Sequence, residues 1–199
     1  MISIEELNFS YETQILSDLR LNVEEDDRLA IIGENGTGKT TLLKIIGGIE
    51  RRYEGKVVNH FSKISFVPSD LDNFLLPWYT IAENLAFYST NGNSLNFSEE
   101  KKYHCLFENL MPKFDKENFF QKKIYKISTG QKAILSILCS LACIPNLIIL
   151  DEIFSNLSIL HSNKVIEHLK KQNITYIFTS HSQRIVENFS TRTFKLSTP

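Results

Sequence analysis

The chain has 199 residues, a hydrophobic fraction of 42%, a charged fraction of 23% and a formal net charge of −1. Its size and composition are those of a globular domain with a full hydrophobic core. The near-neutral charge gives no electrostatic argument for binding nucleic acid or an anionic membrane surface.

The sequence also lacks the marks of a membrane-spanning or secreted chain. No run reaches the roughly 20 apolar residues that span a bilayer, because Pro145 and Asn146 split the best candidate, 135–150. The first six residues have neither the basic region nor the apolar core of a signal peptide. Three cysteines, an odd count, argue against a closed disulfide framework, so we expect a cytoplasmic location.

The N-terminal third predicts strands followed by a phosphate-binding loop. Alternating residues predict strands over 2–9 and 15–23, and the apolar run 29–32 predicts a short buried strand. Residues 33–40 read GENGTGKT and match G-x-x-x-x-G-K-[ST] at every fixed position, ahead of a predicted helix over 41–46. In this setting, backbone N–H groups and the helix N-terminus converge on phosphate oxygens.

Two side chains of this loop carry specific roles. Lys39 is expected to bridge the outer phosphates, and the Thr40 hydroxyl is expected to ligate Mg²⁺. The alternative, a glycine-rich turn that binds nothing, fits poorly with Gly-Lys-Thr at this spacing. The predicted nucleotide-binding residues here are Gly33, Asn35, Gly36, Thr37, Gly38, Lys39, Thr40 and Thr41.

The rest of the chain alternates strands with helices. Strands are predicted over 53–58, 63–67, 147–150 and 174–178, with a helix over 159–169. Such alternation implies an α/β fold with a mostly parallel sheet covered on both faces. Ligands bind at the carboxyl ends of strands in these sheets, which is where the phosphate loop lies.

The middle of the chain is different. Helical spacing over 81–87 and a helix start capped by Ser98 predict a helical subdomain, about 71–145, inserted in a single domain spanning 1–199.

Polar residues at two further strand ends complete a candidate catalytic site. Asp151 and Glu152 follow the apolar strand 147–150; Asp151 is expected to hold Mg²⁺, and Glu152 to act as the general base toward water. His181 follows the next strand and could hydrogen-bond the γ-phosphate and fix Glu152. Each signal alone is weak, since many strands end in Asp and most histidines are ordinary surface or core residues.

A second anion-binding helix start lies at Ser128-Thr129-Gly130-Gln131, where Ser128 could cap the helix. One nucleotide needs only one anion-binding helix start for its phosphates, and the phosphate loop already supplies it. The second such helix start therefore indicates a surface that meets a nucleotide held by another copy.

Taken together, these segments resemble the ATP-binding cassette (ABC) family over nearly the whole chain. The matching motifs run in family order: Tyr11, GENGTGKT, Phe66-Val67-Pro68, ISTGQK, LIILDE and TSHS. The resemblance implies a P-loop NTPase (RecA-like) sheet with N-terminal antiparallel strands, and ATP and Mg²⁺ as cofactors. It implies that Tyr11 stacks on adenine, although an ordinary strand aromatic is the alternative. It also implies a head-to-tail dimer in which Ser128, Gly130 and Gln131 contact the partner's γ-phosphate.

Three positions depart from the family pattern. Ser69 stands where the family usually has a glutamine that contacts Mg²⁺ and water, Ser158 replaces an aspartate, and Cys139 replaces an arginine. We include Ser69 in the predicted site, but these changes bring the rate of hydrolysis into doubt.

The resemblance implies the ATPase subunit of a multi-subunit ABC transporter, working with a separate transmembrane permease and a second ATPase subunit, identical or paralogous. The chain would lie on the cytoplasmic face of the membrane, touch it only through the permease, and bind no nucleic acid. The segment 80–85 favours an exporter. The aromatic run 73–79 either receives the permease or forms subdomain core. The alternatives are a soluble non-transport ABC ATPase and a slow, regulatory nucleotide-binding subunit.

Overall fold

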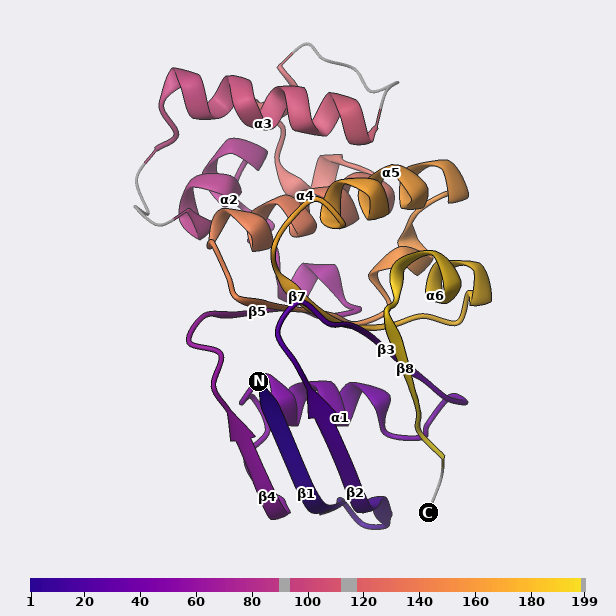
Figure 1. Ribbon diagram of the computed structural model, residues 1–199. Helices are drawn as coiled ribbons and strands as arrows, with labels where there is room; N and C mark the ends of the chain where they lie inside the picture. Colours follow the sequence, from indigo (N-terminus) through magenta and orange to yellow (C-terminus); the bar gives the residue numbers. More distant parts are fainter. Residues whose placement is uncertain (90–93, 112–117, 198–199) are drawn as a thin grey trace. The chain divides into compact units, whose positions relative to one another are not determined.

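The computed structural model describes residues 1–89, 94–111 and 118–197 (Figure 1). The chain forms two compact units. The first contains Met1–Phe66, Pro145–Glu152 and Asn173–Pro199, and the second contains Val67–Ile144 and Ile153–Gln172.

The first unit begins with a three-stranded antiparallel sheet in the order β2-β1-β4. Its strands are β1 (Ile2–Ser10), β2 (Gln14–Val23) and β4 (Glu54–Asn59). Ile2 pairs with Val23 on one side and with Asn59 on the other, so β1 is central and β4 is an edge strand. The predicted N-terminal antiparallel strands are therefore confirmed.

The second sheet has the order β5-β6-β7-β3-β8. β3 pairs in parallel with β7 and β8, and β6 pairs in parallel with β7. This arrangement confirms the predicted α/β class with a mostly parallel sheet. The strands are β3 (Arg28–Ile32), β5 (Ile64–Val67), β6 (Leu147–Leu150), β7 (Thr175–Thr179) and β8 (Arg192–Lys195).

One hydrophobic core joins both sheets of the first unit through α1 (Lys39–Ile46). Leu42, Leu43 and Ile46 of this helix are buried with apolar side chains of β1, β2, β3, β6 and β7. Burial of each such side chain contributes about 1.5–3 kcal/mol. This core fixes the start of α1, and with it the loop that precedes the helix.

The second unit is mainly helical. Its helices are α2 (Ile81–Tyr88), α3 (Phe97–Leu110), α4 (Thr129–Ala142) and α5 (Ile159–Leu169), with short 3-10 helices η1 (Leu71–Asn73), η2 (Phe119–Gln121), η3 (Ile124–Lys126) and η4 (Ile153–Asn156). Within the described ranges, every helix is too short or too polar to cross a bilayer.

One local prediction is wrong, and two short elements were not predicted. The cap of α3 is Asn96, not Ser98: the Asn96 side chain accepts from the Glu99 N–H at 3.0 Å, and the Glu99 carboxylate accepts from the Asn96 N–H at 2.9 Å. This reciprocal pair places the start two residues earlier. The sequence reading also missed α6 (Gln183–Phe189) and β8, which are too short for a clear periodic signal.

Candidate functional site

The phosphate loop connects the carboxyl end of β3 to the first residue of α1. Gly38 caps α1 with φ at +92°, a conformation that side chains rarely adopt, and a Cβ there would lie 2.7 Å from Ile15 Cγ2. At Gly33 a Cβ would lie 2.4 Å from the Leu196 carbonyl oxygen. Both glycines are therefore required by the backbone path itself.

The Lys39 side chain folds back over this loop. Its Nζ donates to the carbonyl oxygens of Gly33 at 3.0 Å and Glu34 at 2.8 Å, and the residue is only 7% exposed. The Thr37 hydroxyl also donates to the Glu34 carbonyl, at 3.0 Å. The charge that would meet phosphates is thus held at the loop, while Asn35 and Gly36 at its tip are exposed.

A buried carboxylate joins the loop to two neighbouring strands. The Thr40 hydroxyl donates to Asp151 Oδ2 at 2.8 Å, and the Thr179 hydroxyl donates to Asp151 Oδ1 at 2.8 Å. Asp151 is 1% exposed, so these two bonds compensate its loss of hydration. A hydroxyl beside a carboxylate is the oxygen set that Mg²⁺ accepts. The residues present therefore fit a magnesium ion.

Glu152 and His181 face each other at the same sheet edge. His181 Nε2 lies 2.8 Å from Glu152 Oε1, with side-chain exposures of 49% and 31%. The Glu152 backbone has φ at +53° and its N–H donates to the Thr179 hydroxyl at 2.9 Å. A non-glycine residue held in this region stores strain of a kind that clusters at functional sites. The structure brings together the predicted Lys39, Thr40, Asp151, Glu152 and His181. Sequence reasoning missed the part played by Thr179.

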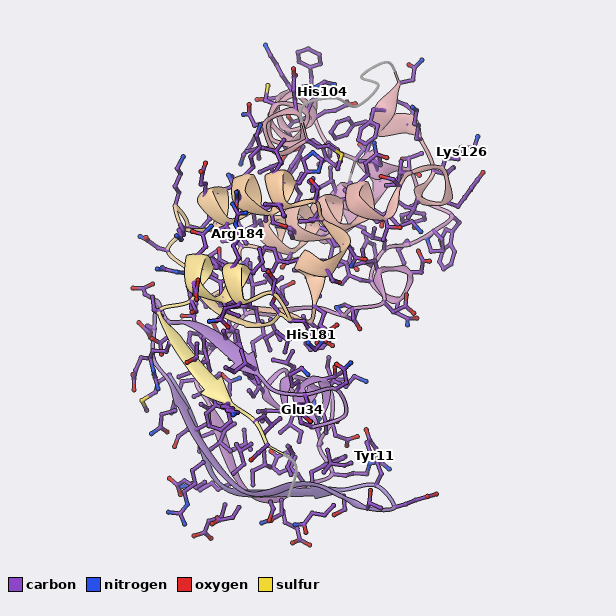
Figure 2. The ribbon with its side chains drawn as sticks, turned by 90° about the vertical axis from the view of Figure 1, so that its right-hand side faces the viewer. Tyr11, Glu34, His104, Lys126, His181 and Arg184 are labelled. Carbon is purple, nitrogen blue, oxygen red and sulfur yellow. The ribbon has the colours of Figure 1, made fainter. Side chains whose placement is uncertain are left out.

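Tyr11 lies in the turn between β1 and β2 and is 60% exposed. Its ring packs edge-on against Phe9 with centroids 4.8 Å apart. In Figure 2, Tyr11, Glu34 and His181 lie along one side of the first unit. The Tyr11 ring is therefore open to stacking by a planar ligand.

In the second unit, the predicted Ser128 cap of α4 is confirmed. Ser128 Oγ accepts from the Gln131 N–H at 3.3 Å, and Gln131 Oε1 accepts from the Ser128 N–H at 2.9 Å. A Cβ on Gly130 would lie 3.3 Å from the Asn156 carbonyl oxygen, so α4 begins close against η4. In its contact with the Gln131 N–H, the Ser128 hydroxyl uses its oxygen as an acceptor, and a hydroxyl can donate one further hydrogen bond.

The two serine departures also lie in the second unit. Ser69 is exposed just after β5. Ser158 caps α5, because its Oγ accepts from the His161 N–H at 3.4 Å and lies 3.0 Å from His161 Nδ1. A serine therefore preserves the helix start that an aspartate would also cap.

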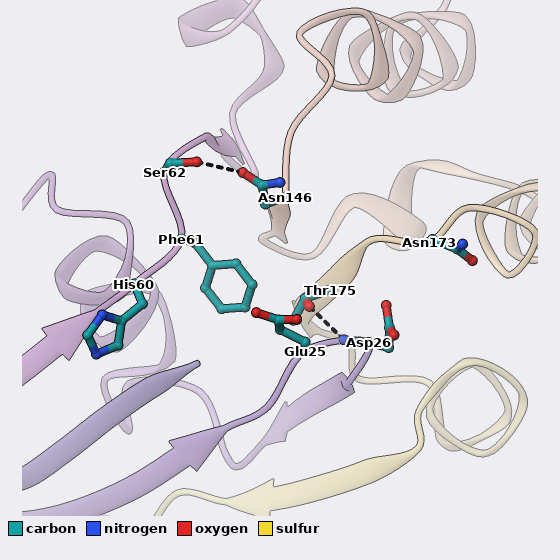
Figure 3. Close-up of a pocket in the computed structure, with 8 residues that line it drawn as sticks. All are labelled: Glu25, Asp26, His60, Phe61, Ser62, Asn146, Asn173 and Thr175. Atoms are coloured by element: carbon teal, nitrogen blue, oxygen red, sulfur yellow. Dashed lines mark hydrogen bonds between the residues drawn. The ribbon is translucent and has the colours of Figure 1, made fainter.

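A separate pocket of about 250 Å³ lies in the first unit, at the amino ends of β3, β6 and β7 (Figure 3). Its polar rim is closed by hydrogen bonds from Ser62 to Asn146 and from the Asp26 N–H to Thr175, each at 2.9 Å. The phosphate loop follows the carboxyl end of β3. This pocket is therefore not the candidate nucleotide site.

The family model described as "ABC transporter" matches residues 16–155. This range contains the phosphate loop, the capped start of α4 and the two carboxylates after β6.

Similar proteins agree with this match. The spermidine/putrescine import ATP-binding protein PotA of Clostridium novyi is 29% identical over 85% of this chain and 51% of its own. The zinc import ATP-binding protein ZnuC of a Wolbachia species is 29% identical over 91% of this chain and 73% of its own. The chain spans about half the length of several curated relatives it matches.

A solved dimeric ATP-binding cassette bound to ADP and Pi has the same fold. Its TM-score is 0.82 at 24% identity, covering 99% of this chain and 94% of that one.

Proposed function

The chain belongs to the ABC transporter family of ATPases, and from that premise we propose that it binds and hydrolyses ATP as the nucleotide-binding subunit of a multi-subunit transporter. The observation that carries the proposal is the contact of 2.8 Å between the Thr40 hydroxyl and Asp151. It joins the phosphate loop to the tip of β6 and supplies the oxygen pair that a triphosphate–magnesium site requires.

The nucleotide is held by the first unit. Backbone N–H groups of residues 33–41 and the start of α1 receive the phosphates, Lys39 neutralises the outer ones, and Tyr11 stacks on the base. Thr40 and Asp151 hold Mg²⁺, which when bound offsets negative charge on the phosphates.

Glu152 acts as the general base that orients water and accepts its proton. The contact with His181, 2.8 Å away, fixes the direction of the carboxylate. General bases contribute about 10²–10⁴-fold in rate. His181 also has an exposed face from which it can hydrogen-bond the γ-phosphate.

Two cassettes act together, either as identical copies or as paralogues. Ser128, Gly130 and Gln131 form a second anion-binding helix start, and this chain's own phosphate loop already provides one. The start of α4 therefore meets the γ-phosphate bound by the other subunit. Hydrolysis removes that bridge and loosens the dimer.

A membrane permease, carried on a separate polypeptide, docks on the aromatic turn of residues 76–80. The residues of the aromatic run 73–79 differ in exposure. Phe74 and Leu75 are buried in the second unit, whereas Trp78 is 65% exposed. Trp78 packs edge-on against Tyr79, with ring centroids 6.5 Å apart. Docking therefore rests on Trp78 and Tyr79, whereas Phe74 and Leu75 belong to the core of the second unit. The chain reaches the cytoplasmic membrane face through this contact.

We favour import over the export that residues 80–85 led us to expect, because the relatives from Clostridium novyi and Wolbachia carry import in their names. A slow, regulatory subunit is a second candidate. The observation that favours it is exposed Ser69, whose side chain is shorter than glutamine.

The test is nucleotide-driven dimerisation. Glu152→Gln should retain ATP, lose turnover and sediment as a dimer with ATP and Mg²⁺. Lys39→Ala should weaken binding of a fluorescent ATP analogue and stay monomeric. A Glu152→Gln protein that hydrolyses ATP at the parent rate would contradict the base assignment. If the parent chain hydrolyses ATP more slowly than a matched Ser69→Gln variant, the result would support the slow, regulatory subunit.

A further inference from the structure

An ion pair in the second unit ties the start of α4 to the segment that leads into the aromatic turn. Lys132 Nζ lies 2.7 Å from Asp72 Oδ1, and the Lys132 side chain is only 17% exposed. A cation in the first turns of a helix is disfavoured by the helix dipole. The placement of Lys132 therefore needs a compensating carboxylate, which Asp72 provides.

Lys132 is bound directly to the cap of the helix. Its backbone N–H donates to the Ser128 carbonyl at 2.9 Å, the first hydrogen bond of α4. Displacing Lys132 would therefore displace Ser128. Because Gly130 gives this first turn low intrinsic stability, the turn depends on such contacts.

Asp72 is held in place by its own segment. Asp70 caps η1 by accepting from the Asp72 N–H at 3.1 Å. Further along, the buried Asn84 side chain accepts from the Leu76 N–H at 2.8 Å and donates to the Thr80 carbonyl at 3.0 Å. The ion pair thus anchors α4 to a segment that continues, through hydrogen-bonded backbone, into the aromatic turn.

We infer that Lys132 is a positioning residue: through Asp72 it holds Ser128 and Gly130 where they meet the nucleotide of the second subunit. This inference rests on the proposed ATP-bridged dimer. If the inference holds, the aromatic turn and the start of α4 move together within the second unit, because the Asp72–Lys132 pair connects them.

The experiment uses the full chain with Glu152→Gln and measures the dimer dissociation constant at saturating ATP and Mg²⁺ by sedimentation. Asp72→Asn and Lys132→Met should each weaken the dimer by about 3- to 10-fold, since each dimer contains the pair twice. The double variant should be no weaker than either single one. Lys132→Arg should restore most of the affinity, and binding of a fluorescent ATP analogue to the monomer should stay unchanged.

Lys164→Met is the matched control. It removes another lysine tether of the second unit, from Lys164 Nζ to the Asn109 carbonyl at 3.0 Å, and should leave the dimer unchanged. The inference is overturned if Asp72→Asn and Lys132→Met dimerise as tightly as the Glu152→Gln parent. It is also overturned if the nucleotide affinity of their monomers falls by as large a factor as their dimer affinity. In both cases the proposed function stands. If Glu152→Gln itself remains monomeric with ATP, the proposed function fails and the inference with it.

Discussion

The Thr179 hydroxyl donates to Asp151 Oδ1 at 2.8 Å and accepts from the Glu152 N–H at 2.9 Å. One threonine on β7 therefore orients two consecutive residues at the tip of β6. The carboxylate that we propose holds Mg²⁺ and the proposed base are positioned by the same oxygen atom.

Thr179→Val should lower kcat for ATP hydrolysis and destabilise the fold by about 1–3 kcal/mol, because buried Asp151 loses a donor without losing volume around it. Thr179→Ser keeps the hydroxyl and should retain most of the parent's kcat and most of its free energy of unfolding. Urea unfolding and steady-state kinetics measure the two effects. Equal kcat for the valine and serine variants would contradict this role.

Trp78→Glu should abolish co-purification of the chain with the proposed membrane permease, because a charge cannot enter an apolar docking contact without a large desolvation cost. ATP affinity should be unchanged. Phe97→Glu is the control, since Phe97 is 84% exposed on α3 of the same unit. Equal recovery of membrane proteins with both variants would exclude the aromatic turn as the docking surface.

Ile144→Gly should raise the free energy of unfolding by about 0.5–1 kcal/mol. Ile144 follows the C-cap of α4 with φ at +49° and is 65% exposed, so its side chain contributes little burial to offset the backbone strain. Glycine adopts this conformation without a Cβ clash. Thermal unfolding measures the gain. Ile144→Ala keeps a Cβ and should not raise the free energy of unfolding. If alanine stabilises the protein as much as glycine does, backbone strain at residue 144 is not the cause.

Stability should fall as the pH rises from 10 to 12, in part because burial raises the pKa of Tyr88 to about 12. In the unfolded chain tyrosine loses its proton near pH 10, so the native state binds more protons in this window and is progressively destabilised. Tyr88→Phe should make the decline shallower, although it also removes a hydrogen bond to the Phe74 carbonyl. Urea unfolding at several pH values checks the slope. Parallel curves for the two proteins would contradict this prediction.

Much of the first unit could be predicted because its motifs impose backbone geometry. Gly33 and Gly38 stand where a Cβ would clash, and Asp151 follows four fully buried residues of β6. Thr179 gave no comparable signal, because threonine is common in strands for reasons of packing alone. Its role depends on β6 and β7 being neighbours, which only the sheet pairing reveals.

The second unit was harder to predict from sequence. Phe74, Leu75 and Trp78 belong to one apolar run, yet the first two are buried and the third is exposed. Their burial depends on tertiary packing, not on local periodicity. The Asp72–Lys132 pair likewise joins residues 60 positions apart, with no motif that connects them.

The folded-back Lys39 has a consequence for nucleotide selection. Its ammonium group already has two carbonyl partners within the loop, so an arriving ligand has to outcompete them. A triphosphate brings more negative oxygens to this exchange than a diphosphate does. The two carbonyl oxygens of the loop therefore compete with phosphate oxygens for Lys39, and a ligand that offers more negative oxygens is better able to displace them.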